Sequence, residues 1–280
     1  MELLTINNEL FSFKDNLLKM MDDKPYICSE MKHTFTTLLL VVLFSSMGTS
    51  QSVKDSSIFT TQVSLSYAAQ IPECDLKNRF GWNSNIGFNV DIKLASNWVL
   101  GINSQFFFGN QVKDTSMLTD MYTSNGQIIN QNGAFANVLA YERGWIFTGN
   151  IGKIFPIIGP NPNSGILFKF GVGFIQHKVR IEAEQDLVPQ FTGEYSKLYD
   201  RYTNGLVLTQ FIGYSHMGNK GLANFFAGID LSEGFTRGRR LRQAGAETEV
   251  NKSRTDLLMG LRAGWIVPIR KRPLQDFYLN

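Results

Sequence analysis

Segments of about ten residues in which apolar and polar side chains alternate recur along residues 62–268. In one of them, Ile86 and Phe88 fall on one face of an extended strand, whereas Asn89 and Asp91 fall on the other. This two-residue period predicts β-strands with one face suited to hydrocarbon and the opposite face suited to polar contacts. Strands of this kind, separated by turns, are typical of a transmembrane β-barrel.

Eight such segments can be placed, and the connections between them alternate between long and short. This alternation is expected when one barrel end faces the periplasm and the other faces outside, with both termini in the periplasm. The longest connection, at about residues 110–137, is expected to be a polar loop, whereas residues 205–215 fit least well because both faces carry apolar residues. No apolar run reaches the about 18 residues that a membrane-spanning helix needs. We therefore predict an all-β fold, an eight-stranded antiparallel up-and-down transmembrane β-barrel.

The N-terminal region has the composition of an export signal. Lys32 and His33 precede an apolar run at residues 38–44, and the small residues Gly48 and Ser50 follow it, as signal peptidase cleavage requires. The expected organisation is residues 1–30 as a leader or mis-assigned start, 31–50 as a signal peptide, 51–61 as a periplasmic N-terminal segment, 62–268 as the outer-membrane barrel and 269–280 as a periplasmic tail.

The inward faces of the predicted strands carry charges of both signs. An eight-stranded barrel has an interior just wide enough for side chains to fill it, so a wide diffusion pore is not expected. We predict that an internal polar network in the lumen contains Asp91, Lys93, Glu142, Lys169, Asp230 and Arg262. Aromatic girdles at the two membrane interfaces are predicted to contain Trp98, Phe108, Trp145 and Trp265.

A secreted lipocalin is the main alternative, because it is also an eight-stranded up-and-down barrel. A lipocalin barrel holds a ligand in its interior, so its apolar side chains would face inward. With this sequence, that arrangement would crowd Trp98, Phe106 and Phe108 into a narrow lumen and would expose Asp91 and Lys93. The pattern therefore favours insertion into a membrane.

The sequence offers few residues for catalysis or metal binding. Only His177 and His216 follow the signal segment, and they lie in different predicted strands, which argues against a metal site built from several imidazoles. His177 is the candidate for a lipid-modifying enzyme that combines a histidine with a serine and an acid. We predict no metal site, no cofactor and no nucleic-acid partner.

Four arginines crowd the last predicted outer loop, namely Arg237, Arg239, Arg240 and Arg242. Guanidinium groups form charge-assisted hydrogen bonds with phosphates and carboxylates. The cluster predicts contact with lipopolysaccharide phosphates or with an acidic partner, and a solvated loop that only carries charge is the plainer alternative. Outer-membrane lipid and lipopolysaccharide are thus expected partners, together with other outer-membrane or periplasmic proteins.

Longer strings of the sequence carry a family resemblance. They are DLKNRFGWNSNIG at residues 75–87, SNWVLGINSQFFFGNQVKD at 96–114, ERGWIFTGNIGKIFP at 142–156, NPNSGILFKFGVGFIQHKVRIE at 161–182 and TNGLVLTQFIGY at 203–214. This chain resembles a family of uncharacterised outer-membrane β-barrel proteins from Bacteroidota-type bacteria over nearly all of residues 62–268. The resemblance implies an outer-membrane location and a barrel fold, and it brings no catalytic residue. Unlike typical outer-membrane barrels, the chain does not end on an aromatic residue.

These observations predict a non-enzymatic integral outer-membrane protein. It would be a structural element or an accessory subunit of an outer-membrane assembly, secretion or surface complex. Two alternatives stay open at this point: a lipid-modifying barrel enzyme that uses His177, and a narrow channel.

Overall fold

The computed structural model describes residues 57–184, 188–218, 224–240, 244 and 252–269. The strands are β1 (Thr60–Cys74), β2 (Asn83–Lys93), β3 (Trp98–Gly109), β4 (Ile128–Ile129), β5 (Phe135–Phe155), β6 (Gly165–Glu184), β7 (Thr203–Met217), β8 (Asn224–Gly238) and β9 (Ser253–Ile269). The short 3-10 helices are η1 (Leu76–Asn78), η2 (Ser116–Met121), η3 (Pro189–Phe191) and η4 (Tyr195–Leu198). The expected leader, the signal peptide and almost all of the expected C-terminal tail lie outside the described residues.

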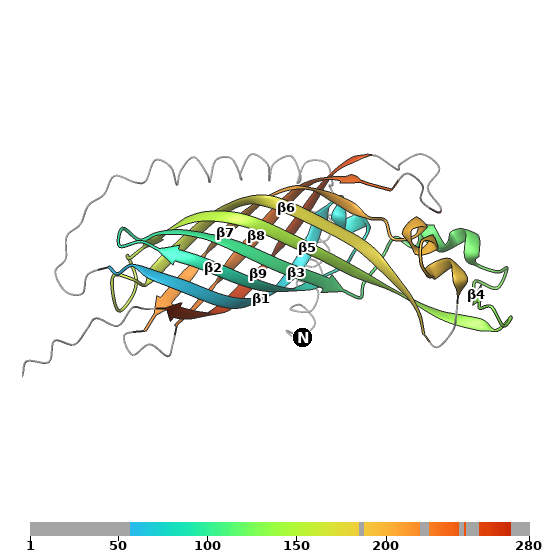
Figure 1. Ribbon diagram of the computed structural model, residues 1–280, viewed down its shortest axis with the longest axis horizontal. Helices are drawn as coiled ribbons and strands as arrows, with labels where there is room; N and C mark the ends of the chain where they lie inside the picture. The colour runs from blue at the N-terminus through green and yellow to red at the C-terminus, as the bar shows by residue number, and fades with distance from the viewer. Residues whose placement is uncertain (1–56, 185–187, 219–223, 241–243, 245–251, 270–280) are drawn as a thin grey trace, which may run out of the picture. The chain divides into compact units, whose positions relative to one another are not determined.

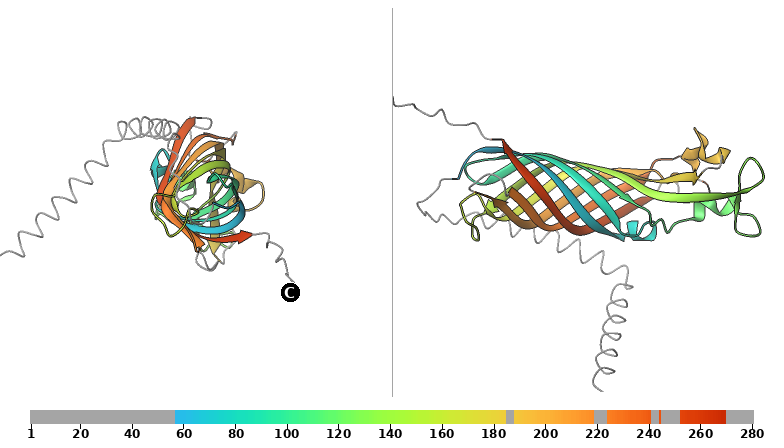
Figure 2. Two further views of the ribbon diagram at one scale, coloured as in Figure 1. Left: turned by 90° about the vertical axis from the view of Figure 1, so that its left-hand side faces the viewer. Right: turned by 90° about the horizontal axis from the view of Figure 1, so that it is seen from below.

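Eight of these strands close into a barrel, since β1 pairs with β9 and β3 pairs directly with β5. All neighbours in the ring are antiparallel. Strand β4 stands apart and pairs only with the beginning of β5. Figure 1 shows the strands inclined along the barrel, and the end view in Figure 2 shows the closed ring. The predicted eight-stranded, antiparallel, up-and-down fold is confirmed.

Side chains alternate between the interior and the exterior of the barrel. In β2, alternate residues are buried in the interior, and most of the residues between them are exposed. The outward side chains are mainly large and apolar, and Leu65, Phe88, Ile102 and Phe147 are all exposed. This arrangement is the reverse of the one expected for a lipocalin. Within the described ranges, no helix has the length and apolar character needed to cross a membrane.

The four aromatic residues predicted at the membrane interfaces lie near the two ends of the barrel wall, two at each end. Trp98 is the first residue of β3, and Trp265 lies close to the end of β9, so both are near the short connections. Phe108 and Trp145 lie near the opposite end, where β3 pairs with β5. The ring of Phe106 joins them, because its centroid is 5.0 Å from that of Trp145 and 5.8 Å from that of Phe108.

The short connections include a tight turn at residues 94–97, which joins β2 to β3. The backbone N–H of Leu94 donates to the carbonyl of Trp98 at 2.8 Å, and that of Asn97 donates to the carbonyl of Leu94 at 3.0 Å. Asn97 has a φ of 62°, a left-handed conformation that asparagine adopts more readily than most residues with a side chain. Its side-chain amide also donates to the carbonyl of Pro162 at 3.0 Å, which links two turns at the same end of the barrel.

At the opposite end, which we call the loop end, β5 and β6 extend beyond the barrel wall. Strand β3 pairs with β5 only as far as Glu142, and β7 pairs with β6 only as far as His177. The pairing of β5 with β6 continues to Asn137 and Glu184. Figure 1 shows this hairpin projecting from the barrel, with β4 and short helices beside it.

Residues 110–136 and 188–202 form what we call the loop-end lobe. The prediction of a polar loop at 110–137 was wrong in part, because this segment contains η2 and β4. Met117, Leu118 and Ile128 are buried there, in the same cluster as barrel residues such as Phe107. The lobe therefore continues the barrel core outward, and its apolar residues explain why it is structured.

The middle of the bore contains three layers, and further buried polar residues lie at its two ends. An apolar layer near the short connections consists of Val99, Ile154, Leu167, Phe211, Phe226 and Ile266. A second apolar layer at the loop end includes Phe107, Ile146, Ile175, Val207 and Leu258. Polar side chains lie between them. The inward positions of Val207 and Phe211 explain why both faces of residues 205–215 carry apolar residues.

Candidate functional site in the bore and at the loop end

The polar layer joins strands that are not neighbours in the ring. Arg262 of β9 forms an ion pair with Asp230 of β8, with 2.8 Å between Nη2 and Oδ2, and the same nitrogen donates to Oε1 of Gln105 on β3 at 2.6 Å. Gln70 donates to Oδ2 of Asp230 at 3.1 Å, and Asn85 donates to both Gln70 and Gln105 at 3.0 Å. Because two strands separate β9 from β3, the bond from Arg262 to Gln105 crosses the bore.

A second ion pair also crosses the bore. Nζ of Lys169 on β6 lies 2.5 Å from Oδ2 of Asp91 on β2, and β3 and β5 separate these strands in the ring. A cavity lined by Lys169, Asp230 and Arg262 has a volume of about 30 Å³, room for no more than a few water molecules. Side chains therefore fill this part of the bore.

Lys93 and Glu142 lie at opposite ends of the bore, and within the described ranges neither belongs to an ion pair. The buried ammonium of Lys93 donates to Ser57 Oγ and to Asn163 Oδ1, each at 2.9 Å, and to two backbone carbonyls. Asn83 donates to Oε2 of Glu142 at 3.0 Å. The six predicted lumen residues are therefore two ion pairs and two single ionisable residues with neutral partners.

His177 lies inside the barrel and is 1% exposed. Its Nε2 is 2.9 Å from Oδ2 of Asp256, and the hydroxyl of Thr236 donates to the same oxygen. The ring of Phe80 packs edge-on at a centroid distance of 5.8 Å. No serine hydroxyl in the described part of the chain bonds to His177, so the imidazole joins β6 to β9 and has no contact with the lipid-facing surface. The described residues also contain no cluster of three or more His, Cys, Asp or Glu side chains that could hold a metal ion.

An open cavity of about 700 Å³ lies at the loop end, between the β5–β6 hairpin and the lobe. Phe106 and Trp145 line it on the side of the apolar exterior, and Gln176 of β6 also lines it. Its charged lining comprises four cationic residues, Arg143, Lys178, Arg180 and Arg240, and two carboxylates, Glu182 and Asp200. The cavity therefore has a net positive lining, which suits an anionic group.

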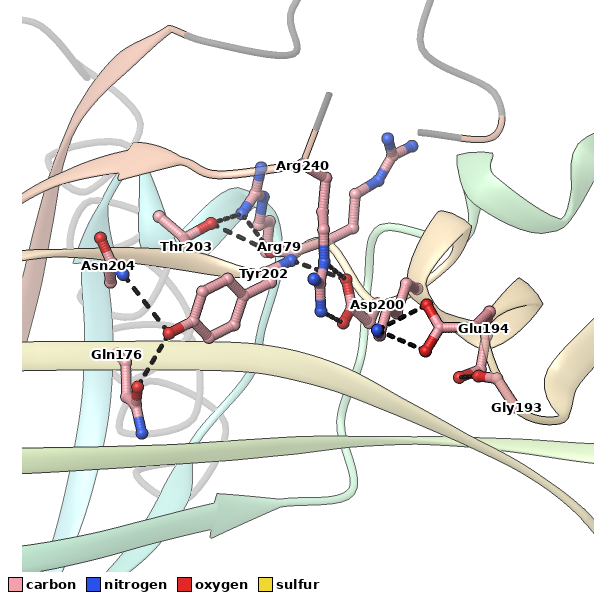
Figure 3. A network of polar contacts seen from close by, with 12 residues as sticks. Arg79, Gln176, Gly193, Glu194, Asp200, Tyr202, Thr203, Asn204 and Arg240 are labelled. Carbon is pink, nitrogen blue, oxygen red and sulfur yellow. Dashed lines mark hydrogen bonds and ion pairs between the residues drawn. The ribbon is translucent and has the colours of Figure 1, made fainter. Parts of the chain in front are cut away.

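Two of the four arginines predicted to form a surface cluster hold the segment that leads into β7. Nε of Arg240 donates to Oδ1 of Asp200 at 2.9 Å, and Nη2 pairs with the other oxygen of the same carboxylate (Figure 3). These hydrogen bonds with Asp200 raise the pKa of Arg240 above its ordinary value. Nε of Arg239 donates to Oδ1 of Asn204 at 2.6 Å. Both side chains thus bind groups of the protein itself.

Tyr202 joins this segment to the barrel wall. Its hydroxyl donates to Oε1 of Gln176 at 2.9 Å and accepts a hydrogen bond from Asn204 at 3.3 Å, as Figure 3 shows. The guanidinium carbon of Arg240 lies 5.0 Å from the centre of the Tyr202 ring. Arg237 faces outward on β8 opposite Asn204, and Arg242 lies outside the described residues. The predicted cluster is therefore spread between the wall and the lobe.

Three cationic residues of the cavity, Arg143, Lys178 and Arg180, were not singled out from the sequence. Arg143 and Lys178 are directly opposite each other in the pairing of β5 with β6, and both face outward. Arg143 lies two residues from Trp145, and Lys178 lies two residues from Gln176, so the two-residue period places both on the outer face. The sequence alone could therefore have identified them as outward-facing cations. That they face each other depends on the pairing register, which the sequence alone does not give.

No protein-family model matches the sequence, and neither does a curated protein. The resemblance to the Bacteroidota-type barrel family therefore stays a prediction. The fold is a closed, eight-stranded antiparallel β-barrel with a mainly apolar exterior. Similar solved structures include Ail, the attachment invasion locus protein of Yersinia pestis, in complex with the heparin analogue sucrose octasulfate (11% identity, TM-score 0.37, covering 74% of this chain and 98% of that chain). Another is Neisserial surface protein A, NspA (9% identity, TM-score 0.37, covering 73% and 96%). At such TM-scores the likenesses support no inference about what this chain binds.

Proposed function

We propose that this chain is an integral outer-membrane β-barrel protein without catalytic activity, and that it is a structural or accessory subunit of an assembly, secretion or surface complex. The proposal depends above all on the combination of an apolar exterior with a bore filled by side chains. A closed barrel is stable in hydrocarbon because its backbone polar groups are paired between strands. With the bore filled, the lobe and the loops are the surfaces available to partners.

In the proposed orientation, the short connections and both chain ends are periplasmic, and the long connections face outside. The test is an epitope tag inserted in an exposed connection, because such sites tolerate insertion. A tag after Asn125, in the lobe, should bind antibody on intact cells. A tag after Ile157, in the connection between β5 and β6, should bind only after the outer membrane is permeabilised. Antibody binding to the second tag on intact cells would contradict this orientation.

The loop-end lobe supports a role in contacts with another protein. Its buried residues belong to the same apolar cluster as the loop-end layer of the bore. Arg201 also donates to the hydroxyl of Ser116 at 2.8 Å, which joins the two long connections. A folded surface loses less conformational freedom on binding than a flexible loop does, so it is better suited to a stable interface.

The accessory-subunit role is tested by affinity purification after mild detergent extraction, followed by mass spectrometry. The wild-type protein should recover specific envelope proteins. A matched variant, in which a short Gly-Ser linker replaces residues 116–130, should keep its heat-modifiable gel mobility and lose those partners. Repeated recovery of the wild-type monomer alone would count against the proposed role.

The geometry favours neither alternative function. An enzyme that modifies lipid needs a histidine within reach of its substrate, but the side chain of His177 is enclosed in the bore and bound to Asp256. A narrow channel needs a continuous polar path, but apolar layers lie on both sides of the polar layer. We therefore propose neither function.

A further inference from the structure

The strand register arranges the outward side chains at the loop end in rows. The first row consists of Phe147, Phe174, Leu206 and Phe235, all of them exposed. The second row, toward the lobe, consists of Trp145, Gln176, Asn204 and Arg237. The third row holds Arg143 and Lys178 opposite each other. The exterior thus changes from apolar to cationic over two rows, a distance of about 13 Å along the strands.

Arg143 and Lys178 carry the same charge at directly opposed positions, which is destabilising in an antiparallel sheet. Within the described ranges, neither of them has a carboxylate partner. Nη1 of Arg143 donates to the backbone carbonyl of Glu142 at 2.7 Å, and its guanidinium carbon lies 4.9 Å from the centre of the Tyr141 ring. The pair thus places two positive charges on the outward face, and within the described wall neither of them forms an ion pair.

The carboxylates of the neighbouring cavity are already paired with other cations. Asp200 binds Arg240 through both of its oxygens. Glu182 binds Nε of Arg180 at 2.6 Å. The uncompensated charge of the cavity lining is therefore that of Arg143 and Lys178. These two residues lie one row beyond Trp145, toward the lobe. In a membrane, the anionic headgroups of the surrounding lipid would lie at this level.

We propose that Arg143 and Lys178 bind a phosphate group of the glycolipid in the surrounding outer leaflet, a lipid A phosphate of lipopolysaccharide. The site rests on the proposed outer-membrane location. Ammonium and guanidinium groups form strong charge-assisted hydrogen bonds with phosphate oxygens. The phosphate is lipid-borne because the two cations face outward, next to Trp145 and Phe106 on the apolar surface, and not into the bore.

The test measures binding of bisphosphorylated lipid A by native mass spectrometry, with the full-length protein folded in octylglucoside, a detergent without phosphate. The double variant Arg143→Gln/Lys178→Gln should lose about tenfold or more in affinity, because it removes both charged donors. Lys153→Gln is the matched control. Lys153 lies on β5, with its ammonium over the Trp98 ring at 5.1 Å at the other end of the barrel, and this variant should bind within about twofold of wild type.

Further arms separate the possible outcomes. Wild-type protein should bind lipid A that lacks both phosphates about tenfold or more weakly than it binds bisphosphorylated lipid A. This comparison needs no substitution in the protein. Inorganic phosphate should not displace lipid A, and displacement would overturn the assignment to a lipid. Unchanged binding by the double variant, or an equal loss in Lys153→Gln, would overturn the site.

Folding and location are measured separately. Heat-modifiable gel mobility reports the folding of each variant. If the double glutamine variant does not fold, the single variants Arg143→Gln and Lys178→Gln take its place. Each should lose affinity for lipid A, and unchanged binding by both folded single variants would overturn the proposed pair. Failure of the wild-type protein to fractionate with the outer membrane would overturn the proposed function, whereas correct fractionation without phosphate-dependent binding would overturn this site alone.

Discussion

Buried charges in the bore depend on their partners. The carboxylate of Asp230 accepts from both Arg262 and Gln70, and the guanidinium of Arg262 also donates to Ser66 and Gln105. Removing one member of such a pair leaves the other charge buried without compensation, which is more destabilising than removing both. The same reasoning applies to Asp91 and Lys169.

Replacement of one partner is therefore expected to destabilise the barrel strongly. Arg262→Met should lower the free energy of unfolding by about 3–5 kcal/mol. The double variant Arg262→Met/Asp230→Leu should lose less than Arg262→Met alone, because no unpaired charge remains. Urea unfolding in lipid vesicles, followed by tryptophan fluorescence, measures both values. A double variant less stable than Arg262→Met alone would contradict the coupling.

Close packing in the loop-end layer gives a second prediction. A Cβ added at Gly144 would collide with the ring of Phe107, which is fully buried. Gly144→Ala should therefore cost about 1–3 kcal/mol of stability. Phe107→Leu, added to that variant, should recover part of the loss because leucine leaves room for the methyl group. The same unfolding assay applies, with Phe107→Leu alone as the control, and absence of any recovery would refute this explanation.

The two-residue period was sufficient to assign residues such as Asp91 and Lys93 to the inner face. It did not give their partners. Asp91 meets Lys169 across the bore, whereas Lys93 binds neutral oxygens of Ser57 and Asn163. Contacts between distant strands depend on the diameter and stagger of the closed barrel, and these quantities are not local properties of the sequence.

Among the elements, the turn at residues 94–97 depends on a single residue for its shape and for its links. Asn97 supplies the left-handed conformation, and its side chain accepts a hydrogen bond from Ser57 at 2.7 Å and donates to Pro162 at 3.0 Å. Backbone conformation and side-chain bonding can be separated here by comparing glycine with alanine.

Asn97→Ala loses both contributions and should destabilise the barrel by about 2–3 kcal/mol. Asn97→Gly keeps the backbone conformation and loses only the side-chain bonds, so it should cost about 1 kcal/mol. Differences in urea midpoint at constant slope report these changes. Equal destabilisation by the two substitutions would show that backbone conformation does not contribute.

The elements that form the barrel were more predictable than the lobe. Alternation located all eight barrel strands, least clearly the one at residues 205–215, although β5 begins at Phe135 and so is longer than the alternation indicated. The apolar residues of the segment at 110–137 are interspersed with polar ones without a sustained strand or helix period, so the sequence predicts a polar loop there. Met117, Leu118 and Ile128 become core residues only through contact with the barrel and the other long connection.

For the molecule as a whole, the order of layers decides what can pass through it. The edge-to-face rings of Phe211 and Phe226, 5.4 Å apart, belong to the apolar layer at one end, and Phe107 belongs to the apolar layer at the other. The polar layer is enclosed between them. Ions would have to cross both apolar layers, at a high desolvation cost.

We therefore expect no conductance steps from the purified protein in planar lipid bilayers. The variant Asp91→Ala/Lys169→Ala, which removes one of the ion pairs that cross the bore, should also be silent because both apolar layers remain. Reproducible steps from the wild-type protein would contradict a closed bore. Steps from the variant alone would show that the ion pair, and not the apolar layers, closes it.

The seam between β1 and β9 gives Arg262 a particular place in assembly. Its guanidinium contacts Ser66 on β1 and Gln105 on β3, so the last strand of the barrel completes a network whose other members come mainly from the first three strands. Before β9 pairs with β1, the polar side chains of the unclosed sheet lack Arg262 as a partner, so we expect partly closed states to be unstable. Membrane insertion should therefore be cooperative, and a chain whose β1–β9 pairing has not yet formed should be able to leave the membrane again.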